Sequence, residues 1–543
     1  MLTLVTTIGL TTSDAGESSI ASATPVQPST QPATIPAGEG FANPLDVMLA
    51  DPFIYREADT YFLYATGSTS RGTLVRTSKN LIDWQDLGYA FAKSDDTYSQ
   101  RHFWAPEVFK HGDRYYLHYS ASSARKTLRL VLCDADSPAG PFKEIKAPWF
   151  ESEKAVIDGN VFKDDDGKLY LYYVLDISEN EDSEIHVRRM DQSLRPEKKA
   201  TFCIEPSQEW EGDQWNEAPF VMKRDGVYYL MYSSNYFGDP RYSVGYATAR
   251  SPMGPWTKFE GNPILAPVGG VPGSISQGVS GPGHNAVIDS PDGKEHFIVY
   301  HSHQQQTGQG WRRQLAIDRL RFIDNPDGSP ARMDIAGPTT SLQPMPSGTS
   351  RWPVARSDEF DGALNRDQWL VMSESPSNWS IEDGRLRVRT LDGDIAGDRA
   401  DVRNLFLQYA PAGDFEVTTK LRLKPAADYE QAFLTIYQDH NRFIKVGSVW
   451  SKGGPKFEFA TDVDGVYDYT LTDNPFGTDV ILRVTRRGKA YSAYASGDGK
   501  SWTTLKENLA FDLIDTKIGL AACSPESERE IEATFDFFRI TQE

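Results

Sequence analysis

Cysteine is scarce in this chain, with three residues among 543, namely Cys133, Cys203 and Cys523. They are odd in number and far apart, so they indicate neither a disulfide framework nor a zinc-binding spacing. Basic residues are also in deficit, with 56 Lys and Arg against 76 Asp and Glu. The net charge of −20 argues against a nucleic-acid partner, because binding to phosphates needs a basic surface. A neutral polysaccharide is compatible with this charge.

Long apolar runs are lacking too. No stretch approaches the roughly 20 apolar residues that a membrane span needs. The N-terminus begins MLTLVTTIGL, a short apolar run with no preceding Lys or Arg, which is a weak or truncated signal peptide. Residues 14–40 are rich in Ser, Thr, Pro and Ala, which is typical of a flexible linker. We therefore assign residues 1–40 to a leader and expect a secreted or periplasmic protein.

Helical periodicity is the third absence, and a repeated phrase takes its place over residues 41–325. Each copy has a polar residue, a β-type run, a turn and an aromatic-rich second strand. The five copies follow one another at roughly 55 to 65 residues, which leaves room for four strands each. The sequence therefore predicts a five-bladed β-propeller. The copies open at Ala50-Asp51-Pro52, Trp104-Ala105-Pro106, Ile157-Asp158-Gly159, Glu217-Ala218-Pro219 and Gly283-His284-Asn285.

The residue that heads each copy differs: it is Asp in the first and third copies, Ala in the second, Glu in the fourth and His in the fifth. Because the innermost strands of a propeller converge on one axis, we expect Asp51, Asp158, Glu217 and His284 to form a cluster. Hydrolysis of a glycosidic bond needs one protonated and one ionised carboxyl group. We assign Glu217 as the general acid and Asp51 as the general base. Asp158 is expected to raise the pKa of Glu217 by like-charge repulsion and to orient it.

Aromatic residues surround the predicted acid in the sequence. Trp210, Trp215 and Phe220 are expected to reduce the hydration of Glu217 and so to favour its neutral form. Glu107 lies two positions beyond the residue that heads its own copy. We therefore interpret it as a structural residue.

Further residues are candidates for binding. Arg313 is a candidate clamp for a sugar hydroxyl or a carboxylate, and the alternative is an ion pair at a strand edge. Trp104, Trp215 and Trp311 are candidates for substrate binding, and the alternative is packing within the blades. His284 is either a core residue or a ligand that helps to hold a cation on the axis. Calcium with mostly water ligands suits that position better than zinc, for which no spacing is present.

A second β region follows the repeats. Residues 326–352 are rich in Pro, Gly and Ser and are interpreted as a linker. Residues 353–543 contain alternating strand-like runs with regular turn signals, which favour a two-sheet sandwich of jelly-roll type. These runs are RLRVRT, FEVTTKLRL, AFLTIYQ, RFIKVGSVW, KFEFAT, VILRVTRRGKAYSAYAS and IEATFDFFRI.

The five opening phrases, in this order, resemble glycoside hydrolase family 43 over residues 41–325. The resemblance implies a five-bladed propeller and hydrolysis with inversion. It also implies Asp51 as base, Asp158 as modulator and Glu217 as acid, often with a calcium or sodium ion near His284. The C-terminal region resembles the concanavalin-like sandwich that accompanies many such enzymes, through the phrases DEFDG at 358–362 and SGDGKSW at 496–502.

We therefore expect an all-β, exo-acting glycosidase, with α-L-arabinofuranosidase as the first hypothesis and an oligosaccharide or polysaccharide as partner. β-Xylosidase and β-D-galactofuranosidase stay open, because pocket shape separates these sugars and the motifs do not. A carbohydrate-binding propeller without catalysis is the alternative from another class. A retaining enzyme like families 32 and 68, which also have five blades, is a weaker one. The oligomeric state stays open.

Overall fold

The computed structural model describes residues 40–542 except for thirteen short gaps or single positions. These are 68–69, 124–126, 177–181, 213, 269–277, 304–311, 350–354, 367, 396–401, 412, 464–465, 514–515 and 526–528, and residue 543 at the end is likewise outside the description. Regular structure in the described part consists of β-strands and two short 3-10 helices, η2 (Glu209–Glu211) and η3 (Pro376–Asn378). None of the described helices is long and apolar enough to cross a membrane.

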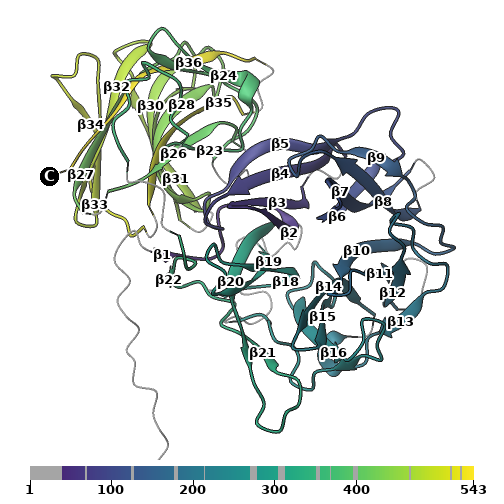
Figure 1. Cartoon of the computed structure of the whole chain (residues 1–543). Helices are drawn as coiled ribbons and strands as arrows, with labels where there is room; N and C mark the ends of the chain where they lie inside the picture. The colour runs from purple at the N-terminus through teal and green to yellow at the C-terminus, as the bar shows by residue number, and fades with distance from the viewer. Residues whose placement is uncertain are drawn as a thin grey trace, which may run out of the picture. The chain divides into compact units, whose positions relative to one another are not determined.

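The first β region is a ring of five four-stranded antiparallel sheets, which confirms the predicted propeller (Figure 1). In each blade the strands are ordered as in the sequence, so the first strand of each sheet heads one repeat. Their bounds are β2 (Ala50–Glu57), β3 (Thr60–Thr66), β4 (Gly72–Ser78) and β5 (Gln85–Ala92) in blade 1; β6 (Arg101–His111), β7 (Arg114–Ser122), β8 (Leu128–Ala135) and β9 (Lys143–Lys146) in blade 2; β10 (Val156–Lys163), β11 (Leu169–Leu175), β12 (Glu184–Met190) and β13 (Thr201–Ile204) in blade 3; β14 (Asn216–Arg224), β15 (Val227–Ser234), β16 (Ser243–Ala249) and β17 (Thr257–Lys258) in blade 4; and β18 (Gly283–Asp289), β19 (His296–His303), β20 (Arg313–Ile323) and β21 (Arg332–Ile335) in blade 5.

Hydrophobic clusters fill the spaces between neighbouring blades. Between blades 1 and 2, Phe91 packs on Tyr119 with ring centroids 5.3 Å apart. Where blade 5 meets blade 1, Leu315 and Phe297 pack against Leu63. Burial of these apolar faces stabilises the ring at about 25 cal/mol per Å² removed from water. The blades are therefore held in fixed positions around the axis.

The ends of the propeller differ from the predicted boundaries. β21 completes the fifth blade, and β22 (Gln343–Pro344) pairs with β1 (Gly40–Phe41). The predicted linker at 326–352 therefore contains two strands, which the Pro and Gly content of the segment concealed. The predicted leader ends within β1, and its residues 1–39 lie outside the described part.

The second β region contains two seven-stranded antiparallel sheets, which confirms the predicted sandwich. Their inner faces share one apolar core, in which Trp369 and Phe538 meet with ring centroids 5.0 Å apart. Each strand-like run named from the sequence corresponds to one strand, except VILRVTRRGKAYSAYAS, which spans two strands and the turn between them. One sheet has the order β23 (Leu370–Met372), β26 (Leu405–Tyr409), β35 (Lys517–Cys523), β28 (Gln431–Asp439), β29 (Arg442–Ser451), β30 (Gly454–Val463) and β31 (Val466–Asp473). The other has the order β24 (Trp379–Glu382), β25 (Arg385–Arg389), β36 (Glu532–Gln542), β27 (Phe415–Arg422), β32 (Asp479–Arg487), β33 (Ala490–Ser496) and β34 (Thr503–Ala510).

Candidate active site

The first strand of every blade carries the same backbone irregularity near its start. The pairing register shifts at this point in all five blades, as in a β-bulge. One residue in each bulge has a left-handed conformation with φ between 44° and 55°. Non-glycine residues adopt this conformation rarely, and it concentrates at functional sites. These residues are Asp51, Ala105, Asp158, Ala218 and His284.

This register corrects one part of the sequence interpretation. In the fourth blade the equivalent residue is Ala218, so Glu217 does not occupy the position of Asp51 and Asp158. Glu217 instead shares its position with Trp104 in blade 2 and Gly283 in blade 5. The candidate acid thus lies one residue earlier in its strand than Asp51 and Asp158 do in theirs.

A ring of hydrogen bonds joins each bulge to the preceding blade. The backbone N–H of Ala105 donates to Thr66 Oγ1 at 2.8 Å, and that of Asp158 donates to Ser120 Oγ at 2.9 Å. The N–H of His284 likewise donates to an equivalent hydroxyl, Ser233 Oγ, at 2.8 Å. These bonds satisfy backbone donors that the bulges remove from the sheet ladder.

Blade 3 has no hydroxyl at the acceptor position, and a carboxylate accepts the hydrogen bond instead. Its residue at the acceptor position is Val174, which pairs with Ile157 and has no acceptor atom in its side chain. The N–H of Ala218 donates instead to Asp158 Oδ2 at 3.2 Å. Asp158 therefore holds the backbone beside Glu217, and its role in orienting the acid stays a prediction.

Asp51 lies beside two cationic or imidazole groups. Arg313 Nη1 donates to Asp51 Oδ1 at 3.0 Å, and His284 Nδ1 lies 3.3 Å from the same oxygen. Burial alone would raise the pKa of Asp51, but Arg313 and His284, with a hydrogen bond from Thr66, outweigh it and lower the pKa. Asp51 is therefore ionised at neutral pH.

Glu217 has the opposite electrostatic environment. Burial raises its pKa to about 7, the charge of Asp51 adds to the rise, and a hydrogen bond from Tyr242 partly opposes it. That bond runs from Tyr242 Oη to Glu217 Oε1 at 2.6 Å. The same buried space thus holds an ionised carboxylate and a carboxyl group that keeps its proton below about pH 7.

Asp158 interacts with both other carboxyl groups. Burial raises its pKa to about 7, His284 lowers it in part, and the charges of Glu217 and Asp51 raise it. The N–H of Ala218 favours the ionised form of Asp158. Asp158 and Glu217 therefore both have a raised pKa of about 7.

Glu107 lies closer to this group than its sequence position suggested. Asn160 Nδ2 donates to Glu107 Oε2 at 3.0 Å, while Val221 N–H donates to Asn160 Oδ1 at 3.1 Å. Burial raises the pKa of Glu107 well above its usual range, and the charge of Asp158 adds to this. Glu107 is therefore a neutral neighbour of Asp158, and its interpretation as a structural residue stays a prediction.

Two of the three predicted aromatic neighbours of Glu217 pack on other side chains. Trp210 packs on Tyr232 with centroids 5.9 Å apart, and Phe220 belongs to the cluster between blades 4 and 5. The aromatic side chain that contacts Glu217 is Tyr242, which sequence reasoning did not name. No motif marks Tyr242, because it precedes the third strand of its blade.

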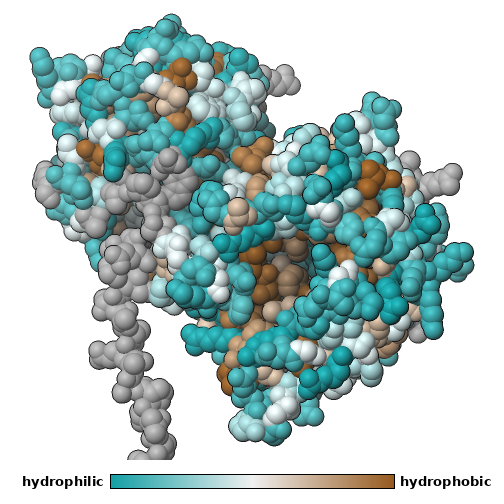
Figure 2. Space-filling model, viewed as in Figure 1, coloured by the Kyte–Doolittle hydropathy of each residue, from teal (hydrophilic) through white to brown (hydrophobic). Residues whose placement is uncertain are grey.

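The predicted substrate-binding residues have different outcomes. Arg313 forms an ion pair with Asp51, as in the alternative considered for it, and its role as a clamp on substrate stays a prediction. Trp104 lies near the ring of His102, with centroids 4.6 Å apart, and Trp215 lies 5.5 Å from the ring of Tyr236. Trp311 falls outside the described residues. Figure 2 shows a hollow in the propeller face with hydrophobic side chains around it.

Comparison with known proteins agrees with this geometry. Residues 41–330 match the model of glycosyl hydrolases family 43, and they make up more than half of the chain. The chain belongs to this family. It is therefore a glycoside hydrolase of an inverting family. Residues 373–543 match a domain of unknown function, DUF1349.

Relatives of this family 43 chain have several activities in their names. A β-D-galactofuranosidase of Aspergillus niger is 28% identical over 227 residues, which cover 41% of this chain and 60% of the relative. An extracellular exo-α-(1→5)-L-arabinofuranosidase of Streptomyces chartreusis is 25% identical over 284 residues, which cover 49% of this chain and 83% of the relative. The crystal structure of a thermostable family-43 glycoside hydrolase is 41% identical with a TM-score of 0.53, and the match covers 57% of this chain and all of that one.

The family resemblance also implied a cation near His284. Among the described residues, no three His, Cys, Asp or Glu side chains form a group that could hold a metal ion. His284 Nδ1 faces the Asp51 carboxylate, so the residues present do not form a protein cage for calcium, which takes six to eight oxygen ligands.

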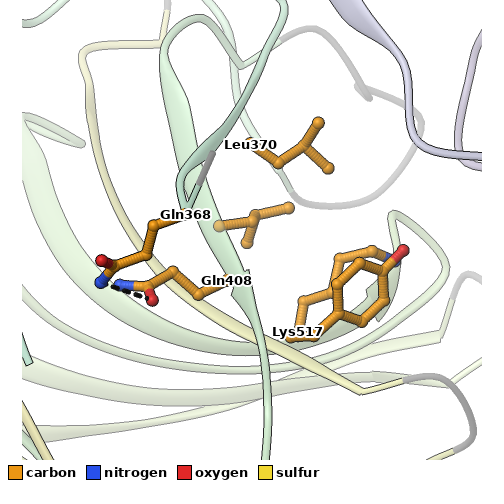
Figure 3. A pocket seen from close by; sticks show the side chains of 6 residues that line it. Gln368, Leu370, Gln408 and Lys517 are labelled. Carbon is orange, nitrogen blue, oxygen red and sulfur yellow. Dashed lines mark hydrogen bonds between the residues drawn. The ribbon is translucent and has the colours of Figure 1, made fainter. Parts of the chain in front are cut away.

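A small crevice in the sandwich is distinct from this site. It is lined by Gln368, Leu370, Leu407, Gln408, Tyr409 and Lys517 (Figure 3). Gln368 Nε2 donates to Gln408 Oε1 at 3.0 Å. The lining contains no carboxyl group, so this crevice has no equipment for glycoside hydrolysis.

Proposed function

We propose that this family 43 enzyme is an exo-acting α-L-arabinofuranosidase, with Asp51 as general base and Glu217 as general acid. The observation that carries the catalytic assignment is the difference in ionisation between two carboxyl groups on one axis. Arg313 and His284 favour the anion at Asp51, whereas burial and like charge favour the neutral acid at Glu217. Inverting hydrolysis requires one group in each state.

The proposed reaction is a single displacement. Asp51 accepts a proton from a water molecule as that water attacks the anomeric carbon. Glu217 gives its proton to the leaving oxygen as the glycosidic bond breaks, so the product has the opposite anomeric configuration. The two carboxyl groups of such an enzyme lie roughly 6.5–9.5 Å apart, and this separation remains a prediction of the proposal.

The choice of sugar is supported by the relatives. The exo-α-(1→5)-L-arabinofuranosidase is matched over 83% of its length, whereas the β-D-galactofuranosidase is matched over 60% of its length. β-D-Galactofuranosidase and β-xylosidase are the alternatives, because these sugars present similar hydroxyl patterns to one pocket.

A panel of 4-nitrophenyl glycosides tests the proposal. We expect the α-L-arabinofuranoside to have the highest kcat/KM and Glu217→Gln to lose most of the turnover of arabino-oligosaccharides. NMR of the first-released sugar should show the inverted anomer. A higher kcat/KM for the β-xyloside or β-galactofuranoside would replace the sugar assignment. Binding without turnover would identify a carbohydrate-binding propeller, and a retained anomer would indicate a covalent mechanism.

Two further expectations are part of the proposal. We propose that the protein is exported, as the composition of residues 1–40 suggests, and the Streptomyces relative is described as extracellular. Cell fractionation would test this, and full retention in the cytoplasm would contradict it. We also propose a weakly held calcium or sodium ion with water ligands near His284. Calorimetry with Ca²⁺ on the native protein and on His284→Ala would test it, and equal heats would contradict it.

A further inference from the structure

We propose that the stacked rings of Tyr242 and His301 form a spacer that sets the separation and orientation of Glu217 and Asp51. This inference rests on the proposed acid and base roles of those residues. Tyr242 donates a hydrogen bond to the side chain of the acid, and His301 accepts one from the backbone of the base. The two rings stack on each other. Both are positioning residues rather than catalytic ones.

On the acid side, Tyr242 determines which carboxyl oxygen carries the proton. Its hydroxyl donates to Glu217 Oε1 at 2.6 Å. An oxygen that accepts this bond is a poor site for the carboxyl proton, so the transferable proton lies on Oε2. After transfer, the same hydrogen bond stabilises the carboxylate that remains. The bond therefore selects one orientation of the acid.

On the base side, His301 holds the backbone of Asp51. The N–H of Asp51 donates to His301 Nδ1 at 3.1 Å, so this nitrogen is unprotonated. At the other four bulges the backbone N–H donates to a different kind of acceptor. The acceptors are the hydroxyls of Thr66, Ser120 and Ser233 and, where blade 3 lacks a hydroxyl, the carboxylate of Asp158. Only at the base is the acceptor an aromatic ring.

The two rings are stacked nearly parallel. Their centroids are 5.6 Å apart with an interplanar angle of 6°, and both side chains are fully buried. A stack of two rigid rings has few internal degrees of freedom. The chain of contacts from Glu217 through Tyr242 and His301 to Asp51 therefore transmits a fixed distance.

Gly283 provides independent support for this role. A Cβ atom at Gly283 would lie 2.2 Å from Tyr242 Cε1, well inside contact distance. The equivalent residues of other blades have side chains, including Trp104 and Glu217. Blade 5 lacks a side chain at this position, and the ring of Tyr242 occupies the space.

Other charged groups also act on the two ends of the spacer. Asp51 and Asp176 raise the pKa of Glu217, and Arg313 lowers it. Arg313, His284 and His303 all disfavour protonation of His301, after burial itself. None of these groups is altered by substitution of Tyr242, so a changed titration of Glu217 in such a variant reports on the hydroxyl.

The test uses the full chain and three variants. Tyr242→Phe keeps the stack and removes the hydroxyl that donates to Glu217, so the pKa of Glu217 should increase. The alkaline limb of the pH profile should therefore move to higher pH by about one unit, and kcat should fall about tenfold. His301→Phe keeps the stack but removes the acceptor, so kcat should fall while the alkaline limb stays. Gly283→Ala should lower kcat by displacing the ring without changing any titratable group. Arabino-oligosaccharides are the substrate, because their poor leaving group depends on the acid.

Independent readouts separate the possible failures. ¹³C NMR of Glu217 at increasing pH, identified by its absence in Glu217→Gln, measures its pKa without substrate. A Tyr242→Phe variant with unchanged Glu217 titration and unchanged kcat would overturn the spacer, whatever sugar the enzyme cleaves. If the native protein cleaves no glycoside of the panel, the proposed function fails, and the NMR titration still decides the contact between Tyr242 and Glu217. If Gly283→Ala does not fold, Tyr242→Phe alone decides.

Discussion

The propeller and the sandwich both bury charged side chains, but they combine them differently. In the sandwich, Lys445 Nζ lies 2.7 Å from Glu458 Oε2 and donates to Gln431 Oε1 at 2.9 Å. Tyr467 donates to the other oxygen of Glu458 at 3.0 Å. Lys445 thus forms its ion pair with one buried carboxylate, and the charge of Asp394 also acts on it. On the propeller axis, Arg313 pairs with Asp51, while Asp158 and Glu217 accept hydrogen bonds from the neutral groups Ala218 N–H and Tyr242 Oη.

This difference in charge balance has a chemical consequence. Burial alone would lower the pKa of Lys445, but Glu458 outweighs it, so the pKa rises well above its usual value and the pair stays charged. In the propeller, excess negative charge and burial raise the pKa of Glu217 and Asp158 to about 7. A matched pair therefore contributes to structure, whereas an unmatched group keeps a proton available for chemistry.

The largest expected effect on turnover comes from substitution of Asp51, the ionised carboxylate of the propeller site. Asp51→Asn removes the base, so kcat/KM should fall by about 10²–10⁴-fold. Asp383→Asn, an exposed carboxylate in the sandwich, is the matched control and should be neutral. Initial rates on the arabinofuranoside measure both. Activity of Asp51→Asn within twofold of the native enzyme would remove Asp51 from its role.

The second effect concerns the single arginine of the group. Arg313 lowers the pKa of Asp51, so Arg313→Met should raise that pKa. Because the base must be ionised, the acidic limb of the pH profile should move to higher pH, so the loss of kcat/KM relative to the native enzyme should grow as the pH falls. Arg389→Met in the sandwich, where the arginine pairs with Glu530 at 3.2 Å, should leave the profile unchanged. An unmoved acidic limb in Arg313→Met would contradict the electrostatic account of Asp51.

A smaller effect is expected at Glu107. This residue is neutral because burial raises its pKa, so Glu107→Gln is nearly isosteric and should change kcat less than about threefold. Glu107→Ala leaves the amide of Asn160 without its acceptor and should cost about 1–3 kcal/mol of stability. pH–rate profiles and urea unfolding measure the pair. A large loss of activity in Glu107→Gln would show that Glu107 acts as an ionised group.

The smallest effect on turnover is expected in the sandwich. Lys445→Met leaves Glu458 buried without its partner, so that domain should lose about 3–5 kcal/mol of stability while kcat per folded molecule stays unchanged. Lys489→Met breaks an exposed pair with Asp512 and should change stability by less than about 1 kcal/mol. Unfolding in urea and active-site titration measure these quantities. A lower kcat in folded Lys445→Met would show that this ion pair affects catalysis, which would contradict the distinction between a structural pair in the sandwich and a chemical site in the propeller.

Much of the architecture was predictable because each element depends on local patterns. Repeated turn and aromatic phrases predicted the blades, and alternation over runs such as 415–423 predicted strands of the sandwich. The strand β21 was missed, because four residues within a segment rich in Pro and Gly produce no periodic signal. The offset of Glu217 from Ala218 was missed as well, because the copies were matched on their polar residue, whereas matching them on the proline places Ala218 opposite Asp51.

The order of short phrases along the chain by itself determined an all-β enzyme with five repeats, and it singled out Asp51, Asp158 and Glu217. Only the tertiary structure decided how these groups differ. Arg313, Tyr242, His301 and Glu107 come from other strands or loops, and closure of the ring brings them beside the three acids. Proton affinity depends on burial and on neighbouring charges within a few ångströms, and such neighbours are set by folding in space rather than by position along the chain.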